Sequence, residues 1–166
     1  MSALEQDAPL SYEPDFDIRK SLLELAPEAW EDAEADDELR PLALRVANKP
    51  ARRLAPPELL ALLEHRLCLP QALPLAVARL SADPFAEARD YPGDLLTAVL
   101  ESDSRYWAEN AALWGDVLEI VARVLETVRA RMEAEDTPEY MPWFVGDEFI
   151  AAVLHFRGIH QGGAEA

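Results

Sequence analysis

Residues 73–100 read LPLAVARLSADPFAEARDYPGDLLTAVL, a run rich in apolar residues that prolines interrupt. Apolar side chains recur at intervals of three and four residues, which is the period of a helix that buries one face. The spacing predicts a helix over 70–81, with Pro74 in its first turn, where a missing N–H does little harm. Asp83 followed by Pro84 ends this helix, because a residue before proline is pushed out of the helical region.

The second half of the stretch predicts a turn followed by another helix. Tyr91, Pro92 and Gly93 form the turn signal, and Asp94 is placed to cap a helix over 94–100. A helix that follows a tight turn packs through its first apolar pair. We therefore expect two leucines of this helix to be largely buried, Leu95 and Leu96.

The helical period continues in both directions along the chain. Asp17 and Asn110 are the expected N-terminal caps of two further helices, and Gly158 is the expected stop of the last one. Evidence for a β-strand is thin and confined to 141–145. The additional helices are predicted over 18–25, 41–48, 56–66, 104–108, 110–135 and 147–156.

These patterns predict an all-α fold. A chain of 166 residues is long enough for one domain with a sizeable core. We expect a single compact domain over 1–166, made of about six to eight short helices with one long helix near 110–135. Its motif-bearing core spans 56–100, and residues 161–166 form a mobile tail.

The composition is strongly acidic. The chain contains 32 acidic and 15 basic residues, for a net charge of −17. Direct nucleic-acid binding requires the opposite charge and is not expected. The N-terminus lacks the basic and apolar regions of a signal peptide, and no apolar run approaches the ~20 residues that span a bilayer. We therefore expect a cytoplasmic protein that does not bind membranes.

The charge is concentrated on both sides of a near-neutral centre. Residues 1–40 carry a net charge of −10, residues 41–100 carry +1, and residues 101–166 carry −8. The densest run, 28–38, contains seven carboxylates and no base. Mutual repulsion predicts that this run is solvated and loosely ordered, or that a cationic partner covers it.

The sequence shows no convincing catalytic or metal-binding constellation. The only cysteine, Cys68, lies among leucines, is not expected to form a dyad with His65, and should be a buried apolar residue. Glu148 and His155 are seven residues apart on one predicted helix, about 10 Å along its axis, which is too far for one metal ion. We expect no enzyme, no metal and no cofactor.

Three short motifs carry a resemblance to a known family. They are Leu73-Pro74-Leu75-Ala76, then Asp83-Pro84-Phe85, then YPGDLL at 91–96 followed by Ala98-Val99-Leu100. Residues 56–100 thereby resemble the all-α immunity proteins of bacterial contact-dependent growth inhibition systems. Residues 19–25 are similar to the family's short N-terminal helix, whereas His65, Cys68 and Ala88 depart from its pattern.

The resemblance implies a protein that binds one secreted toxin domain and blocks it. Such toxins are often nucleases, whose sites are basic because they hold phosphates, and an acidic inhibitor would complement them. We interpret the motif as a fold signature and not as the binding site. Its structural residues are Pro74, Tyr91, Pro92, Gly93, Asp94, Leu95 and Leu96.

We expect the toxin to contact two acidic patches. The N-terminal acidic patch has the highest charge density in the chain and consists of Glu31, Asp32, Glu34, Asp36, Asp37 and Glu38. Trp30 beside it is expected in the core. The C-terminal acidic patch combines carboxylates with aromatic rings, a mixture typical of interface anchors, and consists of Glu133, Glu135, Asp136, Glu139, Tyr140 and Trp143.

Alternatives remain for both function and assembly. An acidic chaperone or adaptor for a secreted or nucleic-acid-binding partner would have a similar composition. We expect a free monomer that forms a 1:1 complex with its toxin. The inward stripe of the long helix is predicted to be Trp114, Val117, Leu118, Val121, Leu125, Val128 and Met132. A second stripe could instead seed a dimer, through Leu113, Ile120 and Val124.

Overall fold

The computed structural model describes residues 14–134 and 147–161. Within these ranges the chain forms nine α-helices and one 3₁₀ helix, and β-pairing is limited to two isolated bridges, which join Ser21 to Pro50 and Glu87 to Pro92. The predicted all-α fold is confirmed. The predicted extended piece at 141–145 lies outside the described residues.

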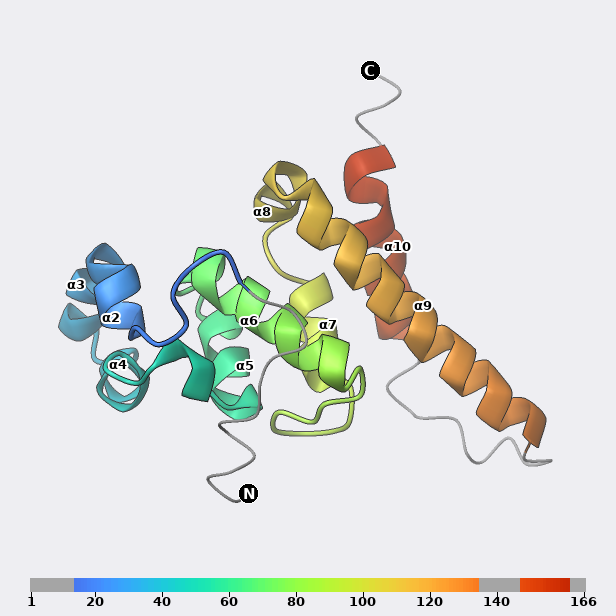
Figure 1. Ribbon diagram of the computed structural model, residues 1–166, viewed down its shortest axis with the longest axis horizontal. Coiled ribbons are helices and arrows are strands. Elements are labelled where there is room, and N and C mark those ends of the chain that lie inside the picture. The colour runs from blue at the N-terminus through green and yellow to red at the C-terminus, as the bar shows by residue number, and fades with distance from the viewer. Residues whose placement is uncertain (1–13, 135–146, 162–166) are drawn as a thin grey trace.

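Between α2 and α9 the helices follow one another with short connections, except for the longer loop at 83–93 between α6 and α7 (Figure 1). Their bounds are α2 Leu22–Leu25, α3 Pro27–Ala35, α4 Arg40–Val46, η1 Ala51–Arg53, α5 Pro56–Glu64, α6 Leu69–Ala82, α7 Asp94–Leu100, α8 Ser104–Glu109, α9 Ala111–Ala134 and α10 Asp147–Gln161. Among these, α9 is the long helix predicted near 110–135. None of them is long and apolar enough to cross a membrane.

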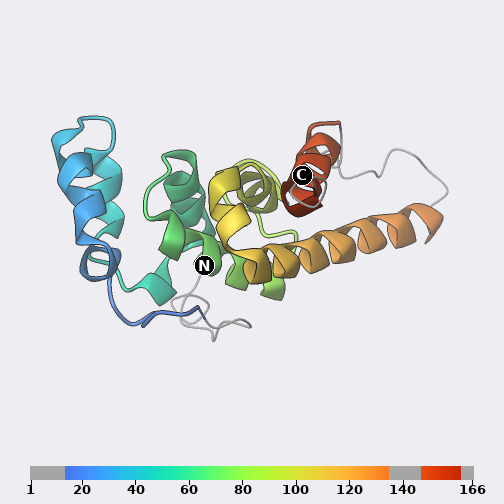
Figure 2. The same cartoon turned by 90° about the horizontal axis from the view of Figure 1, so that it is seen from above.

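The elements are arranged in three groups along the molecule. In Figures 1 and 2, α2, α3 and α4 lie together at one end, α5, α6 and α7 lie in the middle, and the third group consists of α8 beside the middle helices, α9, which runs from α8 to the other end, and α10 alongside α9. Buried apolar side chains from all three groups form one continuous cluster, from Leu22 in α2 to Phe156 in α10.

Helix α6 is the centre of the middle group. Its side chains from Ala72 to Ala78 are all buried, as expected for a helix with neighbours on every side. The prediction that Pro74 lies in the first turn is wrong, because α6 begins at Leu69 and Pro74 lies inside the helix. Pro74 has no N–H to donate to the carbonyl of Pro70 one turn earlier, and Pro70 is exposed, so water can reach that part of the helix.

The first described helix begins later than predicted. Ser21, and not Asp17, is the N-cap: the Ser21 hydroxyl accepts from the Glu24 N–H at 3.2 Å, and the Glu24 carboxylate accepts from the Ser21 N–H at 2.9 Å. This reciprocal capping box satisfies two N–H groups at once. Asp17 instead accepts from the backbone N–H of Arg19 at 3.0 Å and thereby closes a turn.

The acidic run is also more ordered than predicted. Residues 27–35 form α3, whose Trp30 and Ala33 are fully buried, 1% and 0% exposed. Pro27 at the start and Glu28 in the first turn both favour a helix N-terminus. The apolar contacts therefore outweigh the repulsion between carboxylates, which all point to solvent. Trp30 occupies the expected core position.

The long helix buries a face that differs partly from the predicted one. Val117, Val121 and Val128 are buried as expected, but Met132 is 51% exposed. The stripe considered as a dimer seam instead packs into the core of the same chain, where it cannot seed a dimer; it consists of Leu113, Ile120 and Val124.

Aromatic side chains join α8, α9 and α10. The Trp107 and Phe156 rings meet edge to face with centroids 5.0 Å apart, and the Trp114 Nε1–H donates to the Phe156 carbonyl at 2.8 Å. The His160 Nε2 lies 2.7 Å from the Trp107 carbonyl oxygen. These contacts hold the last turn of α10, so the helix continues past Gly158, and the predicted stop at that residue is wrong.

Candidate functional site

Asp94 organises the loop that precedes α7. Its carboxylate accepts three backbone N–H groups: Ala88 at 2.7 Å to Oδ1, and Arg89 and Asp90 at 2.8 Å each to Oδ2. The residue is only 5% exposed. Burial by itself raises the pKa of Asp94, but the backbone N–H groups outweigh burial and hold the pKa below its ordinary value.

The expected role of Asp94 as a helix cap is therefore wrong. The N-cap position of α7 is Gly93, in the left-handed region with φ 98°, a conformation that glycine adopts without strain. The carboxylate points back to the loop and not forward to the helix. The predicted burial of the next two residues, Leu95 and Leu96, is confirmed, since both are 0% exposed.

The fixed loop places Arg89 against the end of α5. Its Nη1 donates to Glu64 Oε2 at 3.0 Å, and its Nη2 donates to Glu64 Oε1, a paired geometry suited to a carboxylate. Nε lies 3.4 Å from Asp90 Oδ2. The hydrogen bond from Arg89 lowers the pKa of Glu64 below its ordinary value. The loop and α5 are thus fastened to each other by an ion pair.

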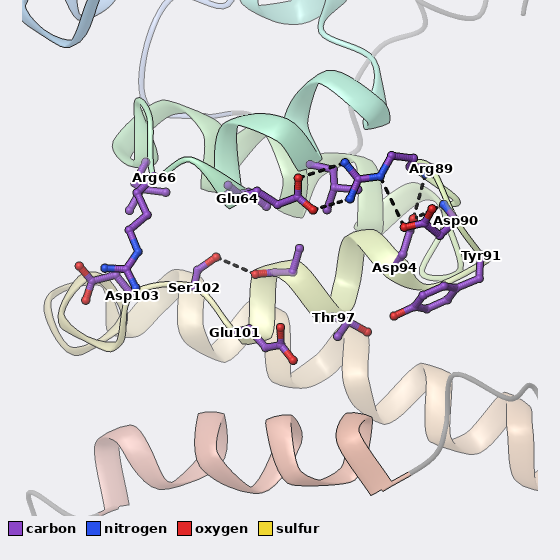
Figure 3. A pocket seen from close by; sticks show the side chains of 14 residues that line it. Glu64, Arg66, Arg89, Asp90, Tyr91, Asp94, Thr97, Glu101, Ser102 and Asp103 are labelled. Atoms are coloured by element: carbon purple, nitrogen blue, oxygen red, sulfur yellow. Dashed lines mark hydrogen bonds and ion pairs between the residues drawn. The ribbon is translucent and has the colours of Figure 1, made fainter. Parts of the chain in front are cut away.

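A groove of about 300 Å³ lies beside this ion pair (Figure 3). The end of α5, the start of α6, the loop at 89–91, α7 and the segment 101–103 form its walls. Carboxylates outnumber guanidinium groups in its lining by five to two; the charged residues are Glu64, Asp90, Asp94, Glu101, Asp103, Arg66 and Arg89. The groove also has apolar walls, formed by Leu60, Leu63, Leu69 and Ala98.

The N-terminal acidic patch lies elsewhere, on α3 and the turn that follows it. All six of its carboxylates are exposed. Arg40, at the start of α4, pairs with Asp37 at 3.0 Å and donates from Nε to the backbone carbonyl of Glu34 at 3.0 Å. Since 28–38 contains no base, Arg40 compensates only a small part of the charge. No residue of this patch lines the groove.

The two predicted patches are not brought together. Glu133, the only member of the C-terminal acidic patch among the described residues, lies near the end of α9 and pairs with Arg129 at 2.6 Å. Figures 1 and 2 place that end of α9 and helix α3 at opposite ends of the molecule. The other members lie outside the described residues: Glu135, Asp136, Glu139, Tyr140 and Trp143.

The described residues hold no cluster of three or more potential metal ligands. Cys68 is buried, as predicted, and burial raises the pKa of its thiol to about 11, which keeps the thiol protonated and unreactive at neutral pH. Ser104 Oγ lies 3.1 Å from His155 Nε2, a pairing that sequence reasoning missed because 51 residues separate the two. Both are solvent-accessible side chains at a helix surface.

The described residues thus form a helical scaffold with an acidic groove and an acidic helix at its surface. Residues 24–117 match the family of CDI (contact-dependent growth inhibition) immunity proteins, and the chain belongs to that family. The matched region contains α3 to α8, the groove and the N-terminal acidic patch. Members of this family are generally non-enzymatic and neutralise a cognate toxin. No curated protein and no solved structure matches the chain.

Proposed function

We propose that this protein binds and neutralises a secreted nuclease toxin domain through an acidic surface. Family membership supports toxin neutralisation, and the net charge of −17 supports a basic partner. A nuclease must hold phosphates with basic side chains, so an acidic protein that covers that surface excludes the substrate. The observation that carries the proposal is the family match, together with a patch of six exposed carboxylates on α3 and its following turn.

Charge on an exposed patch acts mainly on encounter. Carboxylates at the surface attract a basic partner over several ångströms and raise the association rate, and salt screens this attraction. Rapid capture is useful to a cell that a toxin enters, because the toxin acts as long as it is free. The N-terminal acidic patch is suited to this role, since α3 and the turn after it expose all six of its carboxylates.

The triple variant Glu31→Lys, Asp32→Lys, Glu34→Lys tests the patch. We expect its association rate with the cognate toxin domain to fall about tenfold at low salt, with a flatter salt dependence and a dissociation rate within about twofold. Folding should survive because the three side chains are exposed. The measurement is surface plasmon resonance or stopped flow at several ionic strengths.

A matched control moves the same charge change to α8, α9 and α10, with Glu109→Lys, Glu119→Lys and Glu148→Lys, all at exposed positions. If both triple variants slow association equally, net charge and not the patch steers the toxin. If neither changes the rate, the patch serves solubility only.

The nuclease class is tested by adding equimolar protein to the toxin domain during digestion of RNA and DNA. An acidic chaperone would bind the domain and leave its activity intact.

We expect the free protein to be a monomer that forms a 1:1 complex. The apolar stripe considered for a dimer is buried in the chain's own core, and like-charged surfaces repel one another. Light scattering at several protein concentrations should give the mass of one chain, and the mixture should give the sum of one chain and one toxin domain. A dimer mass that does not change on dilution contradicts this prediction.

A further inference from the structure

We propose that the groove between α5 and α7 receives a lysine or arginine side chain of the toxin domain and anchors the complex. This inference rests on the proposed function and adds a second contact to it, distinct from the N-terminal acidic patch. The groove volume of about 300 Å³ lies at the lower end of the range for ligand sites, so it suits one long side chain.

The lining matches both parts of a basic side chain. Lysine and arginine carry an apolar stem that packs on apolar surface and a cationic end that stays with polar groups. Leu60, Leu63 and Ala98 provide apolar wall for the stem, and the five carboxylates provide negative charge for the end. An apolar side chain would bring no partner to Glu101, whose carboxylate has none among the described residues, and an acidic side chain would be repelled.

The carboxylates of the groove differ in what they already bind. Glu64 is paired with Arg89, and Asp94 is occupied by backbone N–H groups. Glu101 is exposed and forms no hydrogen bond or ion pair through its side chain with any residue in the described ranges. Asp103 accepts from the Arg105 N–H through Oδ1 at 2.9 Å, and no described residue donates a hydrogen bond to its Oδ2. These two carboxylates are the expected contacts for the incoming cation.

Backbone charge adds to the same effect. Glu101 is the C-cap of α7, and Glu64 is the last residue of α5, so both helices contribute their C-terminal ends to the groove. The C-terminus of a helix carries partial negative charge from carbonyl groups without intrahelical partners. A cation in the groove is favoured by these ends as well as by the side chains.

The walls are fixed before any partner arrives. Asp94 holds the loop at 88–90 through three hydrogen bonds, and the Arg89–Glu64 ion pair joins that loop to α5 (Figure 3). A preformed groove loses little conformational entropy when it is filled. Such a contact lengthens the life of a complex, whereas an exposed charged patch acts on its formation. We therefore expect substitutions in the groove to change the dissociation rate and substitutions in the N-terminal acidic patch to change the association rate.

The double variant Glu101→Gln, Asp103→Asn tests the anchor. Asparagine keeps the N-cap of α8, so the change removes charge with little effect on folding. We expect dissociation from the cognate toxin domain to become about tenfold faster, with an association rate within about twofold of wild type. Glu109→Gln is the matched control, because Glu109 is also an exposed glutamate at a helix C-terminus and does not line the groove. It should leave the dissociation rate unchanged.

A second measurement does not need the toxin. N-acetyl-arginine amide added to ¹⁵N-labelled protein should shift the amide resonances of 97–103 most, and the shifts should disappear in the double variant and with N-acetyl-norleucine amide, which lacks the charge. If wild type does not bind the toxin domain, the proposed function is wrong, and the arginine probe alone decides whether the groove takes a cation. If the toxin binds but the double variant dissociates like wild type, the anchor is elsewhere. Arginine shifts spread over the acidic surface would also overturn the proposal.

Discussion

Leu96→Ala is expected to lower the free energy of unfolding by about 2–5 kcal/mol, one of the two largest effects that we expect from a single substitution. Leu96 is 0% exposed, and its helix packs against α5, α6 and α10. A cavity there cannot collapse easily, because the surrounding helices are held by one another. Urea denaturation followed by circular dichroism at 222 nm measures the loss.

The control for this change is Leu154→Ala on α10. Leu154 is 62% exposed, so the same atoms are removed from a surface that is already hydrated, and the expected loss is below about 1 kcal/mol. Equal losses in the two variants would show that Leu96 is not packed as described. A loss below about 1 kcal/mol for Leu96→Ala would show that α7 can move to fill the space.

The helices of the middle group could be predicted from sequence because their signals are local. Prolines at 56 and 57 mark the start of α5, Asp83-Pro84 marks the end of α6, and the helical period between these breaks is clear. The N-terminal group was harder. The capping box formed by Ser21 and Glu24 is present in the sequence, but Asp17 offered a competing cap signal.

The acidic run shows how a tertiary contact overrides a charge pattern. Trp30 and Ala33 have the spacing of one helix face, and their burial stabilises α3 although seven carboxylates surround them. The high charge density correctly predicted that the carboxylates of this run are exposed. The prediction that the run is loosely ordered was wrong. Exposed carboxylates repel weakly in water, because solvent and salt screen them. The burial of one large aromatic side chain is worth more.

The groove could not be predicted from local pattern. It combines residues 60–69 with residues 89–103, which meet only when α7 packs against α5. The motif at 91–96 was interpreted as a fold signature, and its leucines do have that role. The same turn also forms one wall of the groove, since Tyr91 and Asp94 line it. A motif that sets the fold therefore also shapes a surface that a partner can reach.

Asp94→Asn is expected to cost about 2–4 kcal/mol at neutral pH, because three backbone N–H groups in buried or part-buried hydrogen bonds lose a charged acceptor, and at least one of them meets an amide N–H₂. Asp90→Asn is the control. Asp90 is exposed, and its side chain contacts only Arg89 at 3.4 Å among the described residues, so its loss should stay below about 1 kcal/mol. Denaturant unfolding at pH 7 measures both variants. Equal, small losses would show that Asp94 does not hold the loop.

The pH dependence gives a second test of the same carboxylate. The pKa of Asp94 is lowered in the folded protein, so the ionised group favours folding at every pH above its unfolded pKa, near 4. That contribution falls as the pH drops from the unfolded pKa toward the folded one, because the folded state must then take up a proton that breaks the N–H contacts.

The stability difference between wild type and Asp94→Asn should therefore be constant from about pH 8 to pH 6 and shrink toward pH 3. Because Asp94 also fixes the loop that carries Arg89, the variant should dissociate from the toxin domain faster than wild type at neutral pH. A difference in stability that does not change with pH would show that the amide disrupts packing and that the charge of Asp94 is not what holds the loop.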